Sequence, residues 1–99
     1  MGELYYEKAS GFVEKHIGNE LVIVPLVGAV AQMDKVFSLN EIGSFIYFLI
    51  DEPKTKGEIL DKILTDFDVT EEIAKTDLDS FLLKAKEAGI VNIINEVTR

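Results

Sequence analysis

Four helix-boundary signals follow one another in the second half of the chain, and they constrain its fold more than any other feature. Asn40 is a good N-cap residue, and Thr55 with Glu58 three residues later has the spacing of a capping box, in which each side chain satisfies a free backbone amide. Thr70 is a third N-cap, and Gly89 suits a left-handed C-cap. The second half of the chain therefore predicts three consecutive helices.

The predicted helices cover about residues 41–50, 55–67 and 71–88, and each has an apolar stripe at spacings of three and four. The stripes are Ile42, Phe45, Ile46 and Leu49; Ile59, Leu60, Ile63, Leu64 and Phe67; and Ile73, Leu78, Phe81, Leu82 and Ala85. We expect these side chains to form the core. Tyr47 and Phe48 lie off the first stripe, so they are candidates for a second contact surface.

The first half of the chain has the pattern of a small antiparallel sheet. Residues 12–16 alternate between apolar and polar side chains, and Gly18 with Asn19 tolerates the positive φ of a tight turn. Residues 20–26 are apolar on both faces and rich in β-branched side chains, which predicts a central strand. Residues 35–39 predict a third strand that leads directly into the first helix.

Three segments have weaker patterns. Residues 1–11 show no sustained period, so we expect a loosely ordered terminus. Residues 27–34 fit either a loop or an extension of the second strand, and residues 90–94 fit either a final strand or an extended tail. With 99 residues, the chain predicts one domain of the α+β class, with a three-stranded antiparallel sheet followed by a three-helix bundle that resembles a winged helix-turn-helix.

The residue types needed for catalysis or metal binding are scarce. Because the chain has no cysteine and one histidine, His16, it has no material for thiolate catalysis, cysteine-ligated zinc or a multi-histidine site. Asp77 and Asp79 are two positions apart on a predicted helix and do not share a face. The glycines do not have the spacing of a phosphate-binding loop. We therefore expect no catalytic residue, no metal site and no cofactor.

The charge balance argues against nucleic acid as a partner. Eighteen acidic residues against ten basic ones give a formal net charge of −8, which repels a phosphate backbone. The longest apolar stretches are far shorter than the roughly 20 residues of a membrane span, and no signal-peptide pattern opens the chain. We expect a cytoplasmic protein with no nucleic-acid or membrane partner, and the absence of cysteine fits a reducing compartment.

A short strand at a sheet edge offers one physical device for binding. If residues 35–39 lie at the edge, their unpaired amides and carbonyls can accept an added strand. Alternate side chains of that guest would enter apolar pockets between the strand and a nearby helix. The sequence therefore favours the binding of an extended peptide.

Three segments together resemble the PqqD family. They are VFSLNEIGSFIYFLID at residues 36–51, TKGEIL at residues 55–60, and DFDVTEEIAKTDLDSFLLKAKEAGIV at residues 66–91. In the last segment Asp77, Phe81 and Leu82 precede the closing Gly89-Ile90 in the order of the family pattern. The resemblance extends from about Phe12 to Val91.

The resemblance implies a non-catalytic recognition domain for ribosomally made peptides that are later modified, as in coenzyme PQQ biosynthesis. The leader of the precursor peptide would add antiparallel to the third strand, beside the third helix, and would be presented to a radical S-adenosylmethionine (radical SAM) enzyme. The implied peptide-binding residues are Lys35, Val36, Phe37, Ser38, Leu39, Asp77, Leu78, Phe81, Lys84 and Ala85. The segment of residues 27–34 is longer and less polar than the tight turn of family members in that pathway. The resemblance therefore does not identify the peptide or its pathway.

A winged-helix transcription regulator is the alternative, because the same arrangement of helices reads DNA in other proteins. The third helix mixes Asp77 and Asp79 with Lys75, Lys84 and Lys86, so it has no uniformly basic recognition face. The sequence favours peptide binding over DNA binding.

Overall fold

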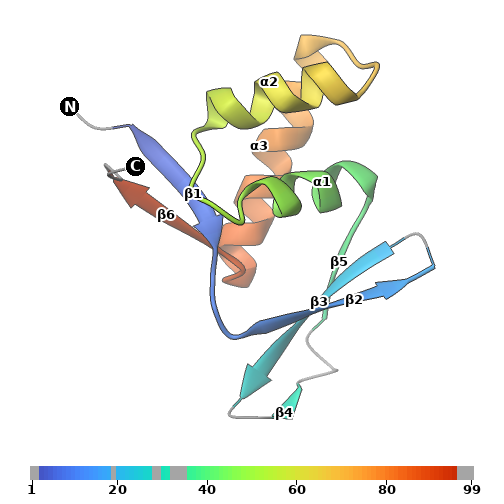
Figure 1. Cartoon of the computed structure of the whole chain (residues 1–99), viewed down its shortest axis with the longest axis vertical. Coiled ribbons are helices and arrows are strands. Elements are labelled where there is room, and N and C mark those ends of the chain that lie inside the picture. Colours follow the sequence, from blue (N-terminus) through green and yellow to red (C-terminus); the bar gives the residue numbers. More distant parts are fainter. Residues whose placement is uncertain (1–2, 19, 28–29, 32–35, 96–99) are drawn as a thin grey trace.

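The computed structural model describes residues 3–18, 20–27, 30–31 and 36–95. A small antiparallel sheet lies against three helices, and a separate two-stranded ribbon flanks the helices (Figure 1). This arrangement confirms the predicted α+β fold.

The sheet is built around one central strand. β3 (Glu20–Val27) pairs antiparallel with β2 (Phe12–Ile17) on one side and with β5 (Phe37–Leu39) on the other, as the apolar character of β3 predicts. The register places Ile23 opposite Phe37 and Leu21 opposite Leu39. The short β4 (Val30–Ala31) pairs with the far end of β3, and the rest of the undecided 27–34 segment, apart from Val27 in β3, lies outside the described residues.

The expectation of a loosely ordered N-terminus is wrong. β1 (Leu4–Lys8) pairs antiparallel with β6 (Val91–Asn95) to form the second sheet, so the open choice for residues 90–94 is settled as a strand. Tyr6 is buried and exchanges backbone hydrogen bonds of 2.8 and 3.0 Å with Lys54. The partner strand lies more than eighty positions away along the chain, and no local pattern in the N-terminal residues reveals such a pairing.

The three helices begin and end at the predicted signals. α1 spans Glu41–Leu49, α2 spans Lys56–Asp66 and α3 spans Glu71–Ala88. Asn40 and Thr70 accept hydrogen bonds from backbone amides three residues on, and Thr55 forms the complete capping box. Gly89 ends α3 with φ of 78°, a left-handed conformation that glycine adopts without strain.

The core lies where the helices meet the sheet and the ribbon. Ile46 of α1 and Ile59 and Ile63 of α2 are fully buried, together with Ala85 of α3. The placement of Tyr47 at a second contact surface is wrong, because its side chain is 2% exposed and belongs to the core. Phe48 is 71% exposed, which agrees with its place off the apolar stripe.

Candidate functional site

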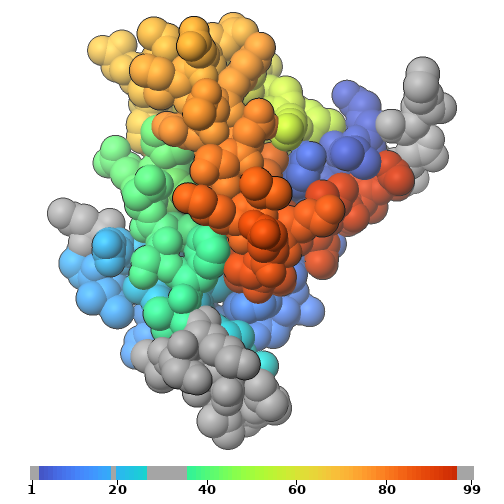
Figure 2. All heavy atoms as spheres, turned by 180° about the vertical axis from the view of Figure 1, so that it is seen from behind, coloured from blue at the N-terminus to red at the C-terminus, as the bar shows by residue number. Residues whose placement is uncertain are grey.

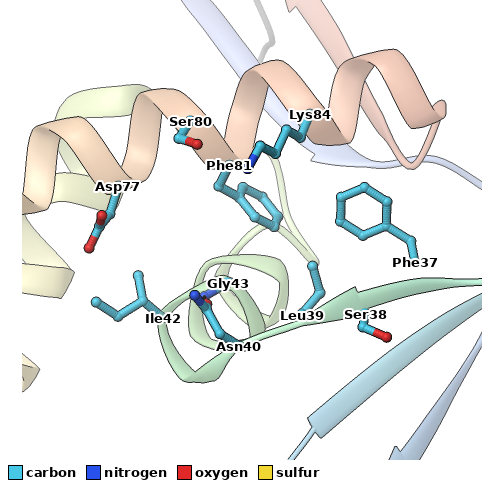
Figure 3. A pocket seen from close by; sticks show the side chains of 10 residues that line it. All are labelled: Phe37, Ser38, Leu39, Asn40, Ile42, Gly43, Asp77, Ser80, Phe81 and Lys84. Atoms are coloured by element: carbon cyan, nitrogen blue, oxygen red, sulfur yellow. Dashed lines mark hydrogen bonds between the residues drawn. The ribbon is translucent and has the colours of Figure 1, made fainter.

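β5 lies at an edge of its sheet. Among the described residues its one strand neighbour is β3, and α3 runs past it on the other side (Figure 3). An edge strand presents backbone amides and carbonyls to which another chain can bind. Of the strand predicted at residues 35–39, β5 contains Phe37–Leu39 and Val36 precedes it. Lys35 lies outside the described residues.

The hydrogen-bond register determines which residue of β5 faces outward. The amide of Leu26 donates a hydrogen bond of 2.8 Å to the carbonyl of Gly11, on the side of β2. The bonding direction alternates along an antiparallel strand, so every second residue before Leu26, including Val22, also bonds toward β2. Leu21 and Ile23 of β3 therefore bond toward β5, where they face Leu39 and Phe37. Ser38 lies between those two residues, so its N–H and C=O point to the open edge.

A hollow of about 180 Å³ adjoins this edge. It lies between β5, the start of α1 and the middle of α3, which are side by side on the face seen in Figure 2. Its lining residues are Phe37, Ser38, Leu39, Asn40, Ile42, Gly43, Asp77, Ser80, Phe81 and Lys84 (Figure 3). The free backbone of Ser38 and the face of α3 therefore border the same space.

Close packing of α1 against α3 shapes the hollow. A Cβ atom built on Gly43 would lie 3.1 Å from Oδ1 of Asn40, which is tighter than ordinary contact, and 3.4 Å from Cδ1 of Phe81, at the lower limit of ordinary contact. Phe81 is 8% exposed and lines the hollow from α3. Glycine at position 43 thus lets the first turn of α1 approach the aromatic ring that forms one wall.

Two opposite charges stand on the α3 wall. Of the ten described residues that line the hollow, only Asp77 and Lys84 are charged. They are seven positions apart, which is about 10 Å along a helix axis. In the described part of the chain, neither side chain has an ion-pair partner, whereas the neighbouring Asp79 binds Lys56 at 2.6 Å.

A second hollow of about 350 Å³ continues the first beyond Phe37, which lines both. Its other lining residues are Phe12, Ile23, Pro25, Val36, Ala88 and Ile90. All of them are apolar, and Val36 is 43% exposed. We call the two hollows together the β5–α3 groove.

The structure brings together most of the residues that the sequence singled out. Phe37, Ser38, Leu39, Asp77, Phe81 and Lys84 line the first hollow, and Val36 lines the second. The placement of Leu78 and Ala85 in a groove is wrong, because they are 2% and 0% exposed and belong to the core. Phe81 belongs to that core as well, but it also lines the hollow together with Asp77, Ser80 and Lys84.

In the first hollow, sequence reasoning missed four lining residues, which are Asn40, Ile42, Gly43 and Ser80. Ser80 lies three positions after Asp77 and four before Lys84, so helical spacing alone places it on their face. The other three directly follow β5, where the chain turns into α1. Their position after the predicted edge strand was the available signal.

No metal-binding cluster and no histidine lines the groove in the described part of the chain. Within residues 3–18, 20–27, 30–31 and 36–95, no group of three His, Asp or Glu side chains could hold a metal ion. The one histidine, His16, lies exposed on β2. In the same part of the chain, no helix is both long enough and apolar enough to cross a membrane.

Tyr47 is the one titratable side chain of the core with a strongly perturbed environment. Burial, and then the negative charges of Glu14 and Asp51, raises the pKa of Tyr47 to about 12. The ammonium of Lys8 lies 4.6 Å from the centre of the ring and also binds Glu14 at 3.2 Å and Asp51 at 3.5 Å. This cluster ties β1 and β2 to the end of α1, away from the groove.

Comparison with known proteins gives one family and one similar solved structure. The family model for coenzyme PQQ synthesis protein D (PqqD) matches residues 20–91, which include β3, β5, all three helices and every residue that lines the groove except Phe12. The structure of TbiB1 in complex with the TbiA(beta) leader peptide has a TM-score of 0.69 and 28% sequence identity; the match covers 87% of this chain and 94% of that one. No curated protein matches the chain by sequence.

Proposed function

The chain belongs to the PqqD family, and we propose that it is a non-catalytic adaptor that binds the leader of a ribosomally synthesised precursor peptide. The adaptor presents the bound precursor to a separate modifying enzyme. The DNA-binding alternative is not supported, since the exposed surface of α3 carries Glu71, Glu72, Asp79 and Glu87 among its lysines.

The observation that carries this proposal is the open backbone of Ser38 beside a hollow. A guest strand that pairs with the N–H and C=O of Ser38 would extend an existing sheet at its edge. Every strand pair in that sheet is antiparallel, and antiparallel pairing is slightly more stable per residue, so the guest runs antiparallel to β5. Alternate guest side chains then enter the β5–α3 groove.

The similarity to TbiB1 supports the choice of a leader peptide as the guest. That protein was solved with the TbiA(beta) leader peptide bound, and its likeness to this chain extends over most of both molecules. A groove with apolar lining and few charges also suits a peptide better than a nucleotide or a metal ion.

The modifying chemistry belongs to a partner in this proposal, and we place that partner among the radical SAM enzymes. The support is the PqqD family itself. The adaptor and its partner would act in the cytoplasm, which fits a chain of 99 residues without cysteine.

The proposal is tested by titrating the protein with precursor leader peptides encoded beside its gene. Fluorescence anisotropy should give saturable binding, and amide chemical shifts should move mainly at β5 and along the groove face of α3. A mixture of oligonucleotides at low salt serves as the control and should not bind. If no neighbouring leader binds, or if the shifts centre on the β1–β6 ribbon, the proposal is wrong.

A further inference from the structure

The charges on the α3 wall define an order of charges in the guest peptide. From the positions of Asp77 and Lys84 we infer that the guest carries a basic side chain followed, toward its C-terminus, by an acidic side chain. This inference rests on the proposed function and adds a rule for which peptides the groove selects.

The residues that line the two hollows show the direction of α3 relative to β5. Asp77 shares the hollow with Asn40 and Ile42, which follow the end of β5. At the other end of the groove, Ala88 lines the second hollow with Val36, which precedes β5. α3 therefore runs opposite to β5, as Figure 3 also shows.

The direction of the guest decides which of the two charges on α3 it passes first. A guest that runs antiparallel to β5 runs in the same direction as α3, so it passes Asp77 first and Lys84 later. The carboxylate of Asp77 attracts a lysine or arginine, and the ammonium of Lys84 attracts an aspartate or glutamate. The order is thus basic first and acidic second.

The distance between Asp77 and Lys84 determines the spacing of the two charged residues in the guest. Groove-facing side chains of an extended strand recur every second residue, or about every 7 Å. Asp77 and Lys84 are about 10 Å apart along α3, and the long side chain of lysine can reach several ångströms either way. The acidic residue of the guest therefore lies two or four positions after the basic one.

No ion pair among the described residues competes with the guest for either charge. In the part of the chain that the structure describes, the ion pairs on the helices join Lys56 to Asp79 and Lys75 to Glu71, and neither pair includes Asp77 or Lys84. The other eight lining residues of the first hollow are uncharged. Charge selection in this hollow therefore falls to Asp77 and Lys84.

The test is selection from a library of capped 12-residue peptides that contain one basic and one acidic residue at varied order and spacing. The wild-type protein should enrich peptides in which the basic residue comes first. The double variant Asp77→Lys with Lys84→Asp should enrich the opposite order, and each protein should prefer its own order by about 3- to 10-fold in affinity. The preference should shrink at high salt.

A matched control carries the same kind of exchange on the exposed surface of α3. Glu87→Lys with Lys86→Glu also leaves the net charge unchanged, and neither residue lines either hollow. This control should keep the wild-type preference, and both double variants should keep the wild-type circular dichroism spectrum.

The outcomes separate this inference from the proposed function. If peptides bind in the groove but the Asp77–Lys84 exchange leaves their charge order unchanged, the inference is wrong and the adaptor function stands. If no library peptide binds and every leader encoded beside the gene also fails to bind, both are wrong. Enrichment of acidic-first peptides by the wild type would overturn the guest direction.

Discussion

Oδ1 of Asn40 accepts a hydrogen bond of 2.8 Å from the amide of Gly43, at the point where β5 turns into α1. Both residues line the first hollow, so the cap that starts the helix also forms part of the candidate binding surface. A Cβ at position 43 would press on this cap and come into contact with the ring of Phe81. The local helix signal and the shape of the groove therefore depend on the same two residues.

Gly43→Ala should weaken leader binding without a gain in stability. Replacing glycine by alanine in a helix usually raises the free energy of unfolding by up to about 1 kcal/mol. At position 43 the new methyl group would instead displace the Asn40 cap or the Phe81 wall. Gly57→Ala is the matched control, because its Cβ would meet only Oγ1 of Thr55 at 3.9 Å. Urea unfolding and anisotropy titration of both variants test this. Equal binding by the two variants would contradict the account.

Phe81→Leu should lower leader affinity about 3- to 30-fold, because the aromatic wall of the hollow is lost while the core stays apolar. Phe48→Leu is the control, since Phe48 is 71% exposed and lines none of the described hollows. Isothermal titration calorimetry measures both affinities. A larger loss for the Phe48 variant would move the binding surface away from the groove.

The stability of the fold should fall as the pH rises between about 10 and 12. Tyr47 has a pKa of about 12 in the folded protein against 10.0 unfolded, so its contribution is complete below pH 10 and is lost as the pH rises through the folded value. The loss is on the order of 2 kcal/mol. In Tyr47→Phe this part of the pH dependence should disappear, as urea midpoints at pH 8 and pH 11.5 would reveal. Parallel losses in both proteins would exclude Tyr47 as the cause.

Proline at the outward-facing positions should reduce binding and spare the fold. In Ser38→Pro the removed amide faces the open edge, and the alternation of β5 carried to the position before the strand predicts the same for Val36→Pro. Leader affinity should therefore fall about 3- to 10-fold while the melting temperature changes little. Phe37→Pro removes an amide that faces Ile23 of β3, so stability itself should fall. Val36→Ala, Ser38→Ala and Phe37→Ala correct for the lost side chains. Unchanged affinity in the first two variants would exclude β5 as the docking edge.

The sequence predicts best the features that local chemistry determines. The caps at Asn40, Thr55 and Thr70 start their helices. The apolar run of β3 predicts a central strand, and β2 and β5 do pair with its two edges. The pairing of β1 with β6 joins the two ends of the chain, and nothing in either segment alone reveals its partner.

That missed pairing also accounts for the error at Tyr47. Helical periodicity places Tyr47 off the apolar stripe, but Lys8 of β1 and Glu14 of β2 cover it. In α3, periodicity places Leu78 and Ala85 in the core, and only the family resemblance implies that they line the groove. Leu78 and Ala85 face the core, while Asp77, Ser80 and Lys84 face the hollow, because the tertiary arrangement of α1 and α2 covers one stripe and leaves the other open.

Hydrogen exchange at the amide of Ser38 tests strand addition most directly. We predict that saturation with a bound leader peptide slows exchange of this amide by at least about tenfold, as expected for an amide that enters a sheet ladder. The amide of Phe37 already faces β3 and should change much less. Saturable leader binding with unchanged exchange at Ser38 would contradict the account, because the peptide would then be held without pairing to β5.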